Sequence, residues 1–328
     1  MKRREFIAAL GGAAASLPFA ARAQPKSMPV IGLLSPGPPG AGGPLLDGFR
    51  QGLGEAGYTE GQNVTIEYHW VEANDRLPAM AADLAGRKVD LIMAITDPVA
   101  LIAKSASSTV PVVFFIGGDP VANGLVASLA RPGGNLTGVT LFGDELNPKR
   151  LEVLSELVPQ AKVIALLVNP SNPFGGTAPV ISSTMQEAAR AKGVQLRIVN
   201  AASESEIDAA FAALPGQQAR ALVIDTDLFF FGQRQRIGAL AARYSVPAIY
   251  YRREFVAAGG LISYGPSFAT AYRQAGMYAG KVLGGVKPSD LPVLQPAKFE
   301  LVINAKAAKT LSLVVPPTLL AIADEVIE

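Results

Sequence analysis

From Pro29 onward, short runs of Val, Ile, Leu and Phe alternate with longer amphipathic segments, and this alternation limits the fold more than any other feature of the chain. The apolar runs show little polar alternation, as strands do when helices cover both faces of their sheet. Candidate strands occupy residues 30–34, 63–68, 91–95, 112–116, 163–168, 195–199, 221–225 and 248–250. Candidate helices occupy residues 43–56, 77–86, 98–105, 149–157, 177–191, 232–244 and 272–283. This order predicts an α/β fold with doubly wound parallel sheets.

A cluster of turn-forming residues at 131–135 (Arg-Pro-Gly-Gly-Asn) interrupts the alternation. Each side of the break holds enough candidate strands for a sheet of its own, and further interruptions fall at 259–266 and 288–296. We therefore predict two lobes and three crossings of the chain, near Val139, Ser263 and Pro296. Lobe 1 would contain residues 29–138 plus about 265–295, and lobe 2 residues 139–264 plus about 296–328, with a cleft between them at the carboxyl ends of the strands.

The first 24 residues have the features of an export signal. Residues 2–4 are basic, a largely apolar stretch follows, and residues 21–23 (Ala-Arg-Ala) provide a small-x-small cleavage site. The pair Arg3-Arg4 indicates a twin-arginine signal, which exports folded proteins. An uncleaved membrane anchor is the alternative, but the apolar stretch has only about 13 residues and a bilayer span needs about 20. We expect residues 1–24 to be removed and the protein to be periplasmic.

The charge and the cysteine content exclude several classes of partner and site. The whole chain has a net charge of +2, and because residues 1–24 carry four basic residues and one acidic residue, the remainder has a net charge of −1. A nearly neutral surface offers no electrostatic footprint for nucleic acid or anionic lipid. The chain has no cysteine, which excludes disulfides, thiolate metal sites, a cysteine nucleophile and a lipid-modified N-terminal cysteine.

Signs of catalysis are sparse. His69 is the only histidine and lies in a strand-like run, so a catalytic triad, a zinc site or a histidine base would each depend on this one residue. The sequence contains no Gly-x-Ser-x-Gly elbow and no phosphate-binding Gly-x4-Gly-Lys-Ser/Thr loop. Carboxylate pairs suited to acid–base chemistry occur in any chain of this length, which leaves a carboxylate-based hydrolase open. We predict a protein that is not an enzyme and that holds no cofactor or metal.

Short polar turns recur directly after the candidate strands. Hydroxyl and amide groups in such turns can join free helix N–H groups in holding a carboxylate, and one aspartate can neutralise an ammonium group. The same residue types are preferred helix N-caps, which is the alternative at each position. Because the strand ends converge on one cleft, we predict a ligand site there. Its candidates in these turns are Ser35, Thr96, Asp97, Asp119, Asn169, Thr226 and Asp227.

Two further candidates come from the region around the last strand of the alternation. Tyr250 ends this strand and can either stack on a flat ligand or seal the lobe core. Glu254 either contacts the ligand or is a surface or hinge charge. The three phenylalanines at 229–231 are interpreted as core, with stacking on a ligand as the alternative.

Several short motifs follow one another in a specific order from residue 118 to the C-terminus. They are Gly-Asp-Pro-Val (118–121), Ala-Arg-Pro-Gly-Gly-Asn-Leu-Thr-Gly-Val (130–139), Asn-Pro-Ser-Asn-Pro (169–173), Arg-Glu-Phe (253–255), Gly-Gly-Leu-Ile-Ser-Tyr-Gly (259–265), Tyr-Arg-Gln-Ala-Gly (272–276), Lys-Phe-Glu-Leu-Val-Ile-Asn (298–304) and residues 316–327. In this order they resemble the family of ABC-transporter substrate-binding proteins that includes tryptophan- and tyrosine-type binders. Thr96-Asp97-Pro98 departs from the smaller, uncharged loop expected there, so Asp97 either alters ligand preference or caps the helix.

The resemblance implies a type I periplasmic-binding fold with three interlobe crossings and ligand capture by hinge closure. It also implies the permease and ATPase of an ABC importer in the inner membrane as partners. We expect a small-molecule ligand, no nucleic-acid partner and a monomer.

The ligand hypothesis is a small zwitterion, namely an amino acid, with an aromatic amino acid as one candidate. Hydroxyl and amide groups of lobe 1 would hold the carboxylate, and Asp227 or Asp119 the ammonium group. Two other functions stay open: a periplasmic ligand-sensing module for a membrane receptor, and an extracytoplasmic hydrolase that uses paired carboxylates. Within the binding class, a nucleoside or a urea-like amide is the alternative ligand.

Overall fold

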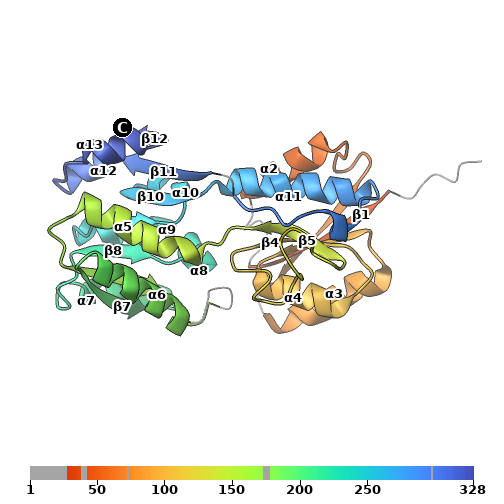
Figure 1. Ribbon diagram of the computed structural model, residues 1–328, viewed down its shortest axis with the longest axis horizontal. Coiled ribbons are helices and arrows are strands. Elements are labelled where there is room, and N and C mark those ends of the chain that lie inside the picture. The colour runs from red at the N-terminus through yellow and green to blue at the C-terminus, as the bar shows by residue number, and fades with distance from the viewer. Residues whose placement is uncertain (1–27, 38–42, 72–73, 173–177, 297) are drawn as a thin grey trace, which may run out of the picture.

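A computed structural model describes residues 28–37, 43–71, 74–172, 178–296 and 298–328, and the predicted export signal lies outside this part of the chain. The described residues form two α/β lobes that lie side by side along the long axis of the molecule (Figure 1). Lobe 1 is the first sheet with its covering helices, and lobe 2 is the second sheet with its own. In the described residues no helix is both long enough and apolar enough to cross a lipid bilayer.

The sheet of lobe 1 is parallel throughout. In the described chain it has the strand order β2-β1-β3-β4-β5, with a topological switch where β1 is flanked by β2 and β3. β3 and β4 are buried along their whole length, so both faces of the sheet need a covering layer. The strands are β1 (Val30–Pro36), β2 (Thr65–Val71), β3 (Leu91–Ile95), β4 (Val112–Ile116) and β5 (Leu136–Thr140).

The sheet of lobe 2 is wider and mixed. Its order in the described chain is β12-β11-β10-β9-β8-β6-β7, and the neighbouring strands are parallel except for β10 and β11. β11 runs antiparallel because the chain re-enters this sheet from lobe 1. The strands are β6 (Val163–Val168), β7 (Gln195–Asn200), β8 (Ala221–Ile224), β9 (Ala248–Tyr250), β10 (Ile262–Pro266), β11 (Phe299–Asn304) and β12 (Glu325–Ile327).

Several helices that connect these strands begin at a capping side chain. Ser203, Ser267 and Asn304 each accept a hydrogen bond from a backbone N–H of the first turn that follows. The α-helices are α2 (Gly43–Glu55), α3 (Leu77–Arg87), α4 (Asp97–Ala106), α5 (Asn147–Leu157), α6 (Ala178–Ala191), α7 (Glu204–Ala213), α8 (Leu228–Gly232), α9 (Arg234–Arg243), α10 (Arg253–Ala257), α11 (Phe268–Leu283), α12 (Ala305–Thr310) and α13 (Pro317–Ile322). Short 3-10 turns are η1 (Asn74–Arg76), η2 (Asp144–Leu146) and η3 (Pro288–Asp290).

Each sheet has an apolar core on both faces. In lobe 1, α2 and α11 cover one face around Phe49, and α3 and α4 cover the other around Leu84. In lobe 2, α5, α6, α12 and α13 cover one face, and α7, α9 and α10 cover the other. The blue helix α11 therefore belongs to the lobe of the red and orange N-terminal elements (Figure 1).

The contact between α2 and α11 requires glycine on both helices. A Cβ atom on Gly52 would lie 1.8 Å from the carbonyl oxygen of Arg273, and one on Gly276 would lie 2.0 Å from that of Phe49. Side chains at these positions would push the two helices apart. The helix that arrives from the C-terminal third of the chain is thus packed backbone to backbone in lobe 1.

Within the described residues the chain crosses between the lobes three times: from β5 to α5, from β10 to α11, and between Leu294 and β11. The first and third crossings run side by side, because the Thr140 N–H donates to Leu294 O (2.9 Å) and the Leu294 N–H donates to Gly138 O (2.9 Å). The predicted α/β fold with two lobes and a hinge of three crossings is confirmed.

Arg150, a fully buried residue of α5, ties two of these crossings together. Its Nη1 donates to Gly143 O (3.1 Å) in the first crossing, to Asn147 Oδ1 (2.6 Å) and to Thr226 Oγ1 (3.2 Å). Its Nε donates to Tyr264 O (2.9 Å), just before the second crossing. The hinge is therefore connected through one side chain to the loop after β8.

Candidate ligand-binding site

A cavity lies between the two lobes, where the carboxyl ends of their central strands face each other. Lobe 1 contributes the ends of β3 and β4, and lobe 2 contributes the loops after β6, β8 and β9. The centre of a water molecule can reach about 80 Å³ of it, which is room for a small solute. Open α/β folds bind ligands at this edge of the sheet. The polar residues that line it are Thr96, Asp97, Asn172, Thr226, Asp227 and Arg252.

Thr96 is held in a conformation that few side chains adopt. Its backbone has φ 90° and ψ 158°, a sparsely populated region for any residue other than glycine. Its Oγ1 is buried and finds no hydrogen-bond partner among the described residues, and it makes no capping bond to α4. A buried polar atom without a partner is unfavourable by about 1–3 kcal/mol. A polar atom of a ligand would remove this penalty.

Asp97 holds the loop after β4 against the start of α4. Its Oδ2 accepts a hydrogen bond from the Gly117 N–H (3.0 Å), and its Oδ1 accepts from the Gly118 N–H (3.2 Å) and from Asn123 Nδ2 (2.9 Å). Burial raises the pKa of Asp97, and these hydrogen bonds oppose the rise. The carboxylate lines the cavity but is bonded to its own loops.

Asp227 organises the lobe 2 side of the cavity. Its Oδ1 accepts a hydrogen bond from the Phe230 N–H (2.8 Å) and caps α8, and its Oδ2 accepts from Asn169 Nδ2 (3.1 Å). Its carbonyl oxygen accepts a bond from the Tyr251 hydroxyl. The loops after β6, β8 and β9 are therefore held together around this residue.

Arg252 is a cavity residue that the sequence reasoning missed. It follows β9 directly, and its side chain is only 1% exposed. Its guanidinium carbon lies 3.7 Å from the ring centroid of Phe231 in lobe 2 and 3.9 Å from that of Phe268 in lobe 1. Two arginines in a row after a strand were visible in the sequence, but which of them points inward is decided by the backbone. Arg253, its neighbour, is exposed and pairs with Glu325.

Aromatic and aliphatic side chains form the rest of the wall. The rings of Phe115 and Tyr272 lie 4.2 Å apart between centroids, and those of Phe115 and Phe268 lie 6.0 Å apart. Leu45 and Leu141 extend this surface. The cavity therefore combines apolar side chains, mainly from lobe 1, with buried polar side chains from both lobes.

The structure brings four of the predicted site residues, Thr96, Asp97, Thr226 and Asp227, to this one cavity. The others do not line it. Ser35 is buried at the end of β1, with its hydroxyl donating to Pro36 O (3.2 Å), and Asp119 accepts from two backbone N–H groups of its own turn. Asn169 supports Asp227 from behind, and Glu254 binds Arg252.

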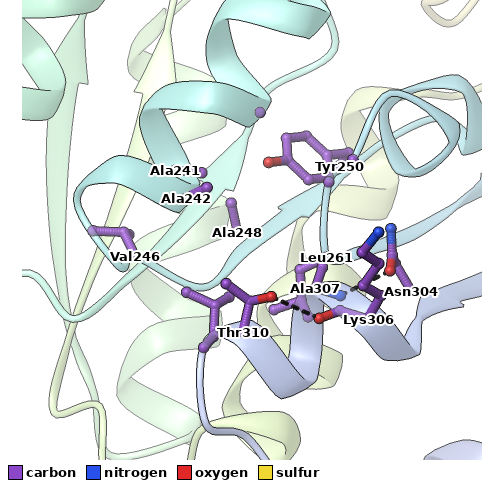
Figure 2. A pocket seen from close by; sticks show the side chains of 14 residues that line it. Ala241, Ala242, Val246, Ala248, Tyr250, Leu261, Asn304, Lys306, Ala307 and Thr310 are labelled. Carbon is purple, nitrogen blue, oxygen red and sulfur yellow. Dashed lines mark hydrogen bonds between the residues drawn. The ribbon is translucent and has the colours of Figure 1, made fainter. Parts of the chain in front are cut away.

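Tyr250 lines a different hollow in lobe 2. Figure 2 shows it beside Ala241 and Ala242 of α9, with Lys306 and Thr310 of α12 at the other side. The side chain is fully buried, stacks on Phe255 at 4.8 Å, and its hydroxyl finds no hydrogen-bond partner among the described residues. Direct contact with a ligand in the interlobe cavity is therefore not expected from this position.

Asp225 lies beneath the cavity and is 1% exposed. Its Oδ1 accepts hydrogen bonds from Asn147 Nδ2 (2.6 Å) and from the Thr226 N–H (2.8 Å). Burial raises the pKa of Asp225 to about 6, although these bonds and the nearby Arg150 charge favour the ionised form. The carboxylate fixes the loop that carries Thr226 and Asp227.

His69 stands apart from this site. It lies on β2, with Nε2 3.4 Å from Oε2 of Glu67, which itself binds Arg87. The described part of the chain contains no group of three His, Cys, Asp or Glu residues that could hold a metal ion.

Comparison with known proteins decides the family. The profile of the family described as "ABC transporter substrate binding protein" matches residues 44–327. The chain belongs to this family. This ABC transporter substrate-binding protein is 29% identical over 278 residues to the "Tyrosine-binding protein" of Clostridioides difficile (strain R20291). The aligned region covers 82% of this chain and 78% of the relative.

Solved structures support the same placement. The "ABC domain in complex with L-Trp" from Streptococcus pneumonia has a TM-score of 0.79 at 25% identity and covers 92% of this chain and all of that chain. A ligand-free, open substrate binding protein with adhesive properties from Clostridium difficile has a TM-score of 0.68 at 26% identity, covering 91% and 99%. The predicted family and its substrate-binding class are thus confirmed.

Proposed function

We propose that this substrate-binding protein captures a small solute, an amino acid or a close relative, between its lobes and delivers it to an ABC importer. The observation that carries the proposal is the shared cavity: strand ends of two separate sheets line it, and aromatic rings and buried charged groups form its wall. The tyrosine-binding relative and the L-Trp complex support this ligand class.

Hinge closure is part of the proposal. Phe268 packs against the cores of both lobes, and Arg252 of lobe 2 rests on its ring. One solved relative is described as ligand-free and open, and another as a complex with L-Trp, which supports a change of arrangement with ligand in this fold. Closure would exclude water from the cavity and strengthen its polar contacts.

Export and partners complete the proposal. Residues 1–24 would direct the folded protein out of the cytoplasm by the twin-arginine route, after which it would act as a periplasmic monomer. The inner-membrane permease and ATPase of the importer would receive the ligand from it. No catalytic step is proposed.

Native mass spectrometry of the freshly purified protein tests the function. We expect one small solute per chain, released unchanged on denaturation and bound again on its return. Conversion of the solute into a product would contradict the proposal and favour the hydrolase. The variant Asp227→Asn keeps an acceptor for the α8 cap and tests whether Asp227 faces an ammonium group of the solute. Weaker rebinding of the solute would support this contact, and unchanged rebinding would exclude it. Asp290→Asn, on the surface, is the control.

A further inference from the structure

Arg252 is the cationic side chain among the described residues that line the interlobe cavity. Phe231 and Phe268 lie against the guanidinium at 3.7 and 3.9 Å between its central carbon and their ring centroids. Contacts of this kind hold an arginine in place by stacking, and they leave the N–H groups at its edges to make hydrogen bonds. Such a guanidinium recognises partners that lie in its own plane.

One edge of this guanidinium is already taken. Nε donates to Glu254 Oε2 (3.3 Å) and Nη2 donates to Glu254 Oε1 (2.9 Å), so Glu254 occupies the Nε–Nη2 edge with both oxygens. Nη1 makes no hydrogen bond to any residue in the described part of the chain. An arginine has five N–H groups and a second edge of the same fork geometry, which suits a carboxylate.

The two carboxylates of the cavity are placed differently. Asp97 accepts hydrogen bonds from two backbone N–H groups and from Asn123, and Asp227 caps α8 and binds Asn169. These bonds hold loops in position. The cavity therefore presents a cation whose second edge is available and carboxylates that are engaged in the scaffold.

The rest of the lining selects the body of the ligand. Phe115, Phe268 and Tyr272 form an aromatic surface, with 4.2 Å between the centroids of Phe115 and Tyr272. Thr96 adds a buried hydroxyl without a partner among the described residues. A flat apolar ligand can stack on the rings while a polar atom meets Thr96.

We propose that the cavity selects small aromatic carboxylates and that Arg252 binds their carboxylate through its Nη1 edge, so that an ammonium group is not required. This inference rests on the proposed binding function and names its ligand class. Deaminated aromatic acids are ligands in the same way as aromatic amino acids. Glu254 positions Arg252 and does not touch the ligand.

A matched series of four compounds tests the class by isothermal titration calorimetry. The series is 3-phenylpropanoate, L-phenylalanine, 3-phenylpropanamide and 2-phenylethylamine, which share a ring and differ in their charged groups. We expect the first two to bind with affinities within about tenfold of each other. The neutral amide should bind about 10- to 150-fold more weakly than the acid, and the amine should show no binding.

Variants of the two adjacent arginines test the residue. Arg252→Gln should weaken binding of 3-phenylpropanoate by about 10- to 150-fold and leave the weak binding of the amide unchanged. Arg253→Gln, at an exposed position paired with Glu325, is the matched control and should bind like the unmodified protein. Because Arg252→Gln leaves Glu254 without its partner, the double variant Arg252→Gln/Glu254→Gln removes both charges and should show the same loss with an intact melting transition.

The inference is overturned if the acid and the amide bind equally, if Arg252→Gln keeps full affinity for the acid, or if no compound of the series binds. The proposed function is judged separately by the native mass spectrometry described above. A co-purifying solute without a carboxylate would leave that function standing and refute the ligand class, whereas chemical conversion of the solute would refute the function.

Discussion

At the scale of single residues, the loop beneath the cavity keeps a carboxylate where water cannot reach it. Asp225 accepts hydrogen bonds from Asn147 and from the Thr226 backbone, and Arg150 lies close to it. Its pKa of about 6 lies above the ordinary value of 3.8. The unfolded chain therefore ionises Asp225 at lower pH than the folded chain does.

This difference predicts the direction of a pH effect on stability. At pH values well below 3.8 the group is protonated in both states, and between about 4 and 6 the unfolded state loses its proton first, so the free energy of unfolding falls as the pH rises. The full loss is on the order of 3 kcal/mol above pH 6. Asp225→Asn should remove this loss, so its stability relative to the unmodified protein should rise from pH 4 to pH 7 in urea titrations.

The surface variant Asp75→Asn is the matched control for this experiment. A stability difference between Asp225→Asn and the unmodified protein that stays constant over the pH range would contradict the prediction. So would a difference that shrinks as the pH rises.

The sequence identified polar residues in the turns after the strands, but it did not show which of their side chains point into the interlobe cavity. Thr96 and Asp227 follow strands that the sequence marks clearly, and both reach the cavity. Tyr250 is the last residue of β9, and its side chain lines the other hollow while Tyr251 lines the interlobe cavity, because successive residues of a strand face opposite sides of the sheet. The role of Arg252 depends on Phe268, which is brought from a helix in the other lobe.

At the scale of elements, runs of branched and aromatic residues predicted β3, β4, β6 and β9 with the bounds that the structure has. β5 and β10 were missed because β5 follows the turn cluster at 131–135 directly and β10 lies within the interruption predicted at 259–266, and each strand contains a glycine. A Cβ on Gly138 would lie 2.1 Å from Phe114 O, and one on Gly265 would lie 2.1 Å from Tyr251 O. These glycines mark places where another backbone approaches a strand closely.

Glycines also allow close backbone approach in the contact between α2 and α11, and this close approach predicts the outcome of a substitution. Gly276→Ala should destabilise the protein by about 1–3 kcal/mol, because the new methyl group would meet the Phe49 carbonyl. The measurement is the midpoint of unfolding in urea.

Gly54→Ala is the matched control, since Gly54 lies in α2 and a Cβ there would meet nothing within 4 Å. This variant should gain about 0.5–1 kcal/mol from helix propensity alone. Equal effects of the two variants would show that the helix contact does not need glycine.

At the scale of the whole molecule, the two lobes are expected to change their separation when ligand binds. The chain has no cysteine, so spin labels can be placed at Ser108→Cys, two residues after the end of α4, and at Glu187→Cys in α6, both exposed. Pulsed electron resonance should give a shorter and narrower distance distribution with the co-purifying solute than without it, because closure fixes one arrangement.

A label pair within lobe 1, Ser108→Cys with Gln62→Cys, serves as the control and should give one distribution in both states. Identical distributions for the interlobe pair with and without solute would contradict hinge closure.

Because the chain passes through both lobes, it also determines when each lobe can complete its folding during translation. The sheet of lobe 1 lacks the cover of α11 until residue 283 is made, and β12 joins the edge of lobe 2 only at residues 325–327. Nearly the whole polypeptide must therefore be synthesised before either lobe can complete its fold, and the two lobes complete their folding together at the end of translation.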